Sequence, residues 1–84
     1  MLQVLFFGRI REELACARLT VELDDHNQDL DGLQEQLVKE HGARWADVLG
    51  QENLIRAVNQ DVATANIRLK AGDEVAFFPP VTGG

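Results

Sequence analysis

The chain ends in the stretch GDEVAFFPPVTGG, residues 72–84, and this stretch decides the fold. Residues 74–78 form an apolar and aromatic run, which is typical of a buried strand. The glycine and aspartate before the run favour a turn. Pro79 and Pro80 must end the strand, because proline has no N–H to donate to a β-ladder. The stretch therefore predicts a turn, a last strand and a stiff exit that closes in two glycines.

A matching strand is predicted at the N-terminus, where residues 2–7 read LQVLFF and Gly8 follows. The run is apolar on both faces, which indicates a central strand rather than an edge strand. The first and last strands are both rich in phenylalanine. We therefore expect them to be parallel neighbours at the centre of one sheet, with the helical connection passing over one face.

The middle of the chain predicts one long helix and two further strands. Residues 30–38 carry leucines at helical spacing, with Asp29 as the N-cap and Gly42 as the glycine behind the helix. Residues 19–23 alternate apolar and polar side chains, as in a strand with one wet face. Residues 54–58 read as a strand that enters a tight turn. The remaining expected elements are a short helix at 10–14, a helical turn at 44–49 that packs Trp45, and a short strand before the last one.

This order of elements predicts an α+β fold with β-grasp, or ubiquitin-like, topology: a mixed sheet with one main helix across it and a flexible C-terminal Gly-Gly tail. We place a β-grasp domain at residues 1–78 and an extended tail at 79–84.

Composition and charge exclude several classes of function. The chain has 84 residues, with 14 Asp and Glu against 8 Lys and Arg, so its net charge is −6. This is the wrong sign for a protein that neutralises phosphates, and we expect no nucleic-acid partner. The N-terminal MLQVLFF is neither a signal peptide nor a membrane span. We therefore expect a cytoplasmic protein with no membrane partner.

The body of the chain offers poor candidates for catalysis. Cys16 is the only cysteine, so it can form no internal disulfide and no cysteine-pair zinc site. His26 and His41 have no cysteine or serine at a recognisable spacing. The adjacent Asp24 and Asp25 lack the remaining ligands of a calcium loop. We predict no metal site and no bound cofactor.

The C-terminal tail, in contrast, has a physical use. Two prolines stiffen the exit from the sheet, and Gly83 and Gly84 can thread a channel too narrow for any Cβ atom. Residues 79–84, fully extended, span about 20 Å. The alternative interpretation is a chain end that frays without function, as many termini do.

Several motifs together resemble the small subunit of molybdopterin synthase. They are the Leu5-Phe6-Phe7-Gly8 run with Arg11-Glu12, the Ala57-Val58-Asn59 segment, and above all residues 72–84. The likeness spans the whole chain by order of elements. Thiamine-pathway sulfur carriers resemble it too, usually in a shorter chain and without Phe-Phe before Pro-Pro.

The resemblance implies a sulfur carrier in molybdenum cofactor biosynthesis that is not catalytic on its own. Its Gly84 carboxylate would be adenylated by an E1-like adenylyltransferase that uses ATP, and then converted to a thiocarboxylate. That end would enter the large synthase subunit and donate sulfur to a pterin precursor within a heterotetramer. An acyl-adenylate has a good leaving group, and a thiocarboxylate sulfur is a strong nucleophile, so the route is chemically sound.

The resemblance also implies which residues act. Gly84 is the reacting residue. The partner-binding residues implied are Phe7, Arg11, Phe78, Pro79, Pro80, Val81, Thr82 and Gly83. For Phe7 and Phe78 the alternative is a place in the core, and for Arg11 it is a solvated charge paired with a nearby glutamate. Three other functions stay open: a thiamine-type sulfur carrier, a ubiquitin-like modifier that forms isopeptide bonds through Gly84, and an adaptor that binds through its Phe-rich surface.

Overall fold

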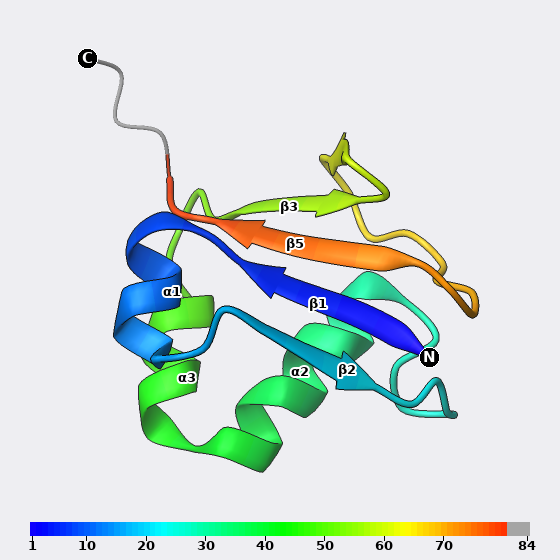
Figure 1. Ribbon diagram of the computed structural model, residues 1–84, viewed down its shortest axis with the longest axis horizontal. Helices are drawn as coiled ribbons and strands as arrows, with labels where there is room; N and C mark the ends of the chain where they lie inside the picture. The colour runs from blue at the N-terminus through cyan, green and yellow to red at the C-terminus, as the bar shows by residue number, and fades with distance from the viewer. Residues whose placement is uncertain (81–84) are drawn as a thin grey trace.

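The computed structural model describes residues 1–80 of the chain, and Figure 1 shows its arrangement. The elements are strands β1 (Leu2–Phe6), β2 (Arg18–Val21), β3 (Ile55–Val58), β4 (Asp61–Ala63) and β5 (Glu74–Phe78), and helices α1 (Gly8–Leu14), α2 (Leu30–His41) and α3 (Ala43–Leu49). The order agrees with the sequence prediction, with small shifts at the strand ends. The predicted strands 2–7, 19–23 and 54–58 are realised as Leu2–Phe6, Arg18–Val21 and Ile55–Val58.

The five strands form one mixed sheet in the order β2-β1-β5-β3-β4. The first and last strands, β1 and β5, are parallel neighbours in which Val4 lies opposite Val75. All the other neighbours are antiparallel. The parallel central pair confirms the prediction from the two phenylalanine-rich runs, and with α2 across the sheet it makes the fold a β-grasp.

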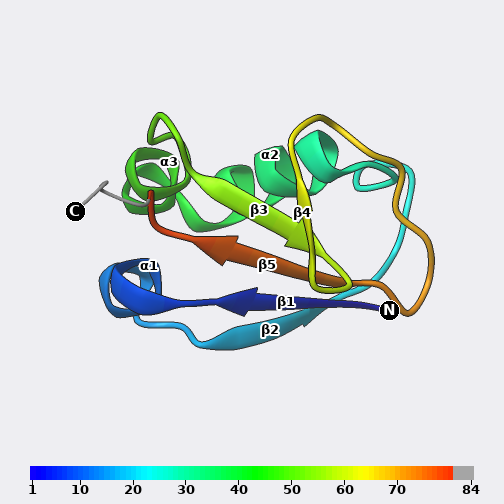
Figure 2. The same cartoon turned by 90° about the horizontal axis from the view of Figure 1, so that it is seen from above.

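Helices α2 and α3 lie on one side of the sheet, behind the strands in Figure 2. Alternate residues of each strand point to this side, because side-chain direction in a strand has a period of two. They meet the leucines of α2 in a single core. Phe6 and Phe77 are buried at its centre with rings 5.7 Å apart, and Trp45 meets Phe6 edge-on at 5.3 Å. Trp45 is thus a core residue, as expected.

Helix α2 begins and ends at the predicted residues. The Asp29 carboxylate accepts a hydrogen bond from the Gly32 N–H at 2.7 Å, which caps the helix. That backbone bond, followed by one from the Asn66 side chain, holds the pKa of Asp29 below its ordinary value. Gly42 ends the helix with a φ of 96°, which favours glycine over other residues.

One residue of the loop before α2 is buried while its neighbours are exposed. Asn27 is fully buried. Its side-chain amide donates to the Glu22 carbonyl and to Gln36, and its side-chain oxygen accepts from the Asp24 N–H. These three partners satisfy the polar atoms of Asn27 within the protein, so it can be buried beside the exposed Asp24, Asp25 and His26.

Candidate functional site

Two phenylalanines meet where the central strands end. Parallel strands bring their carboxyl ends to the same edge of a sheet, and Figure 1 shows β1 and β5 ending side by side next to α1. Phe7 follows β1 and Phe78 ends β5. Their rings stack with centroids 4.7 Å apart and planes 5° apart, and the Phe7 N–H donates to the Phe77 carbonyl at 3.1 Å. The pair stands beside the point where the chain leaves the sheet.

The exit itself packs on the start of α1. Gly8 has a φ of +58°, and a Cβ atom added there would lie 3.2 Å from the Cγ atom of Pro79. Pro79 and Pro80 are both partly buried. Glycine therefore suits position 8 for two reasons: it adopts this positive φ without strain, and it leaves room for the Pro79 ring. The predicted division of the chain into a β-grasp domain at residues 1–78 and a tail at 79–84 stays a prediction.

The sheet face away from α2 and α3 carries an apolar surface, which we call the open-face patch. Its members lie outside the main core cluster. They occupy alternate positions of β1, β3, β4 and β5, together with the residue that follows β1. They are the exposed Phe7 and Val62, the partly buried Leu5, Ile55 and Phe78, and the buried Ala57 and Ala76.

The strand register places these side chains in two rows. Leu5 lies opposite Ala76, Ala76 opposite Ala57, and Ala57 opposite Val62, which makes one row across four strands. The second row holds Ile55 opposite Phe78, with Phe7 stacked on Phe78. Val62 is 65% exposed and Phe7 is 40% exposed. Exposed apolar side chains grouped on one face are a common feature of protein–protein contact sites.

Arg11 is exposed on α1, and its backbone N–H donates to the Phe7 carbonyl at 3.4 Å. The helix has an i,i+4 ion pair, but Arg9 forms it with Glu13 at 3.8 Å. Within residues 1–80 no ion pair involves Arg11, so its guanidinium is open to a partner. The other predicted partner-binding residues, Val81, Thr82 and Gly83, and the reacting Gly84 lie outside the described residues.

A polar clasp holds the opposite end of the two central strands. Asp73 is 3% exposed and accepts hydrogen bonds from the Asn59 side chain and the Lys70 N–H, both at 2.9 Å. The Asn59 side-chain oxygen accepts from the Glu74 N–H at 3.0 Å. Burial raises the pKa of Asp73, but these bonds and the Lys70 ammonium outweigh it, so the pKa lies below its ordinary value. The clasp joins the end of β3 to the start of β5 and so supports the register that places Ile55 opposite Phe78.

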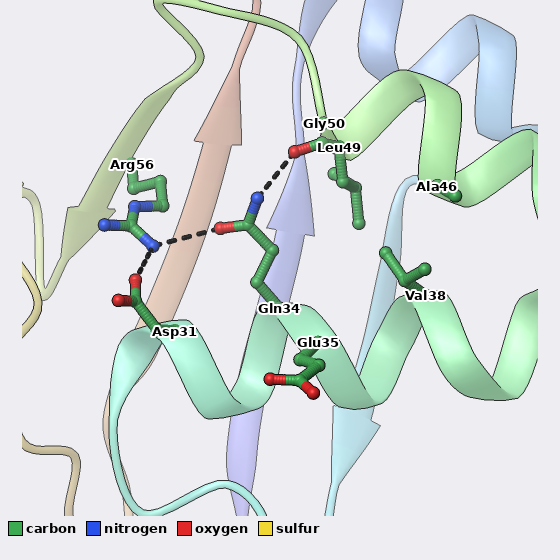
Figure 3. Close-up of a pocket in the computed structure, with 8 residues that line it drawn as sticks. All are labelled: Asp31, Gln34, Glu35, Val38, Ala46, Leu49, Gly50 and Arg56. Carbon is green, nitrogen blue, oxygen red and sulfur yellow. Dashed lines mark hydrogen bonds and ion pairs between the residues drawn. The ribbon is translucent and has the colours of Figure 1, made fainter.

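A hollow of about 380 Å³ lies between α2, α3 and β3 (Figure 3). The Arg56 guanidinium donates to Asp31 and Gln34, and Gln34 donates to the Leu49 carbonyl at the end of α3. These bonds tie two helices to β3. Among the described residues, no three His, Cys, Asp or Glu side chains are grouped to hold a metal ion. The concavity therefore serves packing, and we find no catalytic constellation in it.

Sequence reasoning found the two phenylalanines but missed the other members of the open-face patch. Leu5, Ile55, Ala57, Val62 and Ala76 each look like an ordinary strand residue. The signal available was parity: each lies on the strand face opposite to the one that builds the core. Only the strand order brings these positions into one surface.

The fold and this surface define a class of protein: a ubiquitin-like β-grasp protein with an apolar sheet face beside the exit of its C-terminus. The ThiS family model matches residues 4–84. The chain therefore belongs to the ThiS family.

The similar proteins agree with this assignment. The molybdopterin synthase sulfur carrier subunits of Haemophilus influenzae and Escherichia coli are each 39% identical over 84 residues, covering 100% of both chains. Subunit 1 in a complex of subunits 1 and 2 of the molybdopterin-converting factor from Helicobacter pylori is a solved structure at 28% identity, with a TM-score of 0.68 and 99% and 97% coverage. SAMP1 from Haloferax volcanii, at 22% identity and a TM-score of 0.75 over 99% and 98% of the chains, shows the shared fold.

Proposed function

We propose that this protein is the sulfur carrier subunit of a molybdopterin synthase and that it donates sulfur from a thiocarboxylate at Gly84. The observation that carries the proposal is full-length similarity to curated sulfur carrier subunits, together with the terminal Gly-Gly. The stacked Phe7–Phe78 pair and the open-face patch support it, because they offer a docking surface where the tail leaves the body.

The partner that we propose for this surface is the large synthase subunit. The solved Helicobacter pylori complex joins subunits 1 and 2 of the molybdopterin-converting factor, and its small chain shares the present fold. An apolar patch with an exposed aromatic anchor and a nearby arginine is typical of an interface core with a polar rim. Docking here leaves the C-terminal residues free to extend into the partner's pocket.

The sulfur-loading step requires an activating partner, for which we propose an E1-like adenylyltransferase that uses ATP. The Gly84 carboxylate oxygen attacks the α-phosphorus of ATP, pyrophosphate leaves, and an acyl-adenylate forms. A sulfur nucleophile of the hydrosulfide class then attacks the carbonyl carbon, and AMP leaves with the electron pair of the broken C–O bond. ATP is thus a substrate of the partner rather than a cofactor of this chain.

The proposal is tested by intact-mass measurement after co-expression with the activating enzyme. We expect Gly84 to carry one sulfur in place of one oxygen, and the loaded protein to convert a pterin precursor to a dithiolene when the large subunit is added. A variant with one residue added after Gly84 is the matched control, since it keeps every side chain but moves the carboxylate. Lysine-linked conjugates without any thiocarboxylate would instead indicate a protein modifier.

A further inference from the structure

Strand β2 is an edge strand on which the outward backbone groups of Thr20 are free to pair, whereas the outward Arg18 carbonyl accepts from the Cys16 thiol at 3.5 Å. The Phe6 N–H donates to the Ala17 carbonyl at 2.9 Å. In an antiparallel ladder such bonded positions alternate, so the backbone groups of Leu19 and Val21 also face β1. Those of Arg18 and Thr20 face away from the sheet. Within residues 1–80 the Thr20 N–H and carbonyl have no backbone partner.

A groove lies beside this edge. It has a volume of about 420 Å³, and its walls are β2 and the outer side of α2. Leu19, Val21 and Leu37 supply its apolar surface, and the two β2 side chains are only partly buried. A strand placed beside β2 would lay alternate side chains into this groove, since residues on one face of a strand recur every second position.

The rim of the groove is acidic. Glu22, Asp24 and Glu40 line it, and the chain as a whole carries a net charge of −6. Glu22 and Glu40 are exposed and form no ion pair within the part of the chain that the structure describes. Uncompensated carboxylates at both walls favour a cationic ligand and repel an acidic one.

We propose that the β2 edge and this groove form a second docking site that takes an extended peptide segment by strand addition. The segment would alternate apolar and polar residues and carry lysine or arginine at its ends. Main-chain hydrogen bonds to Thr20 supply the pairing, the apolar residues cover Leu19 and Val21, and the acidic rim selects a basic segment. The site is separate from the open-face patch and does not depend on the proposed function.

The other edge of the sheet also borders a groove of about 420 Å³, but Arg68 and Lys70 line it together with Asp61 and Asp73, so its rim is of mixed charge rather than acidic. Strand β4 spans only Asp61–Ala63 and belongs to a tight hairpin in which Asn59 and Gln60 have φ values of 52° and 71°. Its middle residue, Val62, points to the open face. β4 therefore supplies a control position on an edge whose groove has no acidic rim to select a basic peptide.

Replacement of Thr20 by proline tests the site, because proline removes the outward N–H but no bond to β1. The probe is an acetylated and amidated seven-residue peptide in which valine and threonine alternate between two terminal lysines. Its binding is measured by the fluorescence anisotropy of a labelled peptide and by the amide chemical shifts of the protein. We expect wild-type protein to bind with shifts centred on β2. We expect Thr20→Pro to bind at least tenfold more weakly, and Val62→Pro to bind within twofold of wild type.

A second pair of variants keeps the test decisive if proline disturbs the edge. Glu22→Lys with Glu40→Lys reverses the rim charge, and Glu52→Lys changes an exposed acid elsewhere. The double variant should lose at least fivefold in affinity at low salt, while Glu52→Lys should keep wild-type affinity. Equal binding by the double variant, peptide shifts centred on the open face, or no binding by wild-type protein at millimolar peptide would overturn the proposal.

Discussion

Replacement of Phe7 by alanine should separate docking from folding. The Phe7 side chain is 40% exposed, and a phenylalanine presents about 200 Å², so about 80 Å² remains to be covered by a partner. At about 25 cal/mol per Å² that surface contributes about 2 kcal/mol to binding, which corresponds to about a 30-fold loss in affinity. The other 60% of the residue, about 120 Å², is already covered within the fold, so the same arithmetic gives a loss of about 3 kcal/mol in the free energy of unfolding, and binding is compared at a temperature at which the variant is still folded.

The assay is titration of the large synthase subunit with wild-type and variant protein by calorimetry, with thermal melting as the measure of folding. Ile67 offers a matched control, since it is 38% exposed but lies on the loop whose carbonyl accepts from the Leu30 N–H at the start of α2. Ile67→Ala should bind normally. The reasoning is refuted if Phe7→Ala binds within threefold of wild type, or if Ile67→Ala weakens binding as much.

Two further predictions concern the scaffold behind the site. Since the pKa of buried Asp73 is lowered in the folded state, its contribution to stability is full above the unfolded pKa of about 3.9 and is lost as the pH falls through the folded value. Thermal melting between pH 7 and about pH 2 should therefore show a steeper acid loss for wild type than for Asp73→Asn; parallel curves would contradict this. At Gly32 an added Cβ would lie 2.7 Å from the His26 carbonyl oxygen, so Gly32→Ala should destabilise by about 1–3 kcal/mol. Glu35→Ala, at an exposed position of the same helix, should change the free energy of unfolding by less than about 0.5 kcal/mol, and equal effects of the two variants would show that the contact is readily relieved.

Much of the fold could be predicted because its strongest signals are local. The leucines of α2 recur at helical spacing between a capping aspartate and a glycine, and both ends were confirmed. Pro79 marks the end of β5 by chemistry alone, since it has no N–H. The parallel pairing of β1 and β5 was also predictable, because two runs apolar on both faces belong at the centre of a sheet.

The rest depends on contacts between distant residues. Asn27 reads as a turn residue, yet it is buried because Gln36 and two backbone groups happen to satisfy its amide. The clasp joins Asn59 to Asp73 across the sheet, and neither residue shows this in its local sequence. Likewise the open-face patch is a row in space, assembled from single residues of separate strands.

The strand order explains why one small sheet can present its C-terminus and bind a partner at the same place. If β5 lay at an edge, its last residue would have a neighbour on one side only, and the exit would have no aromatic partner. Because β5 is central, Phe78 is flanked by Phe7 after β1 and by Ile55 on β3. The partner surface is therefore built around the residue from which the tail departs. Under the proposed function, a change that weakens docking at Phe7 would also weaken sulfur transfer from Gly84, because both would depend on the same end of the sheet.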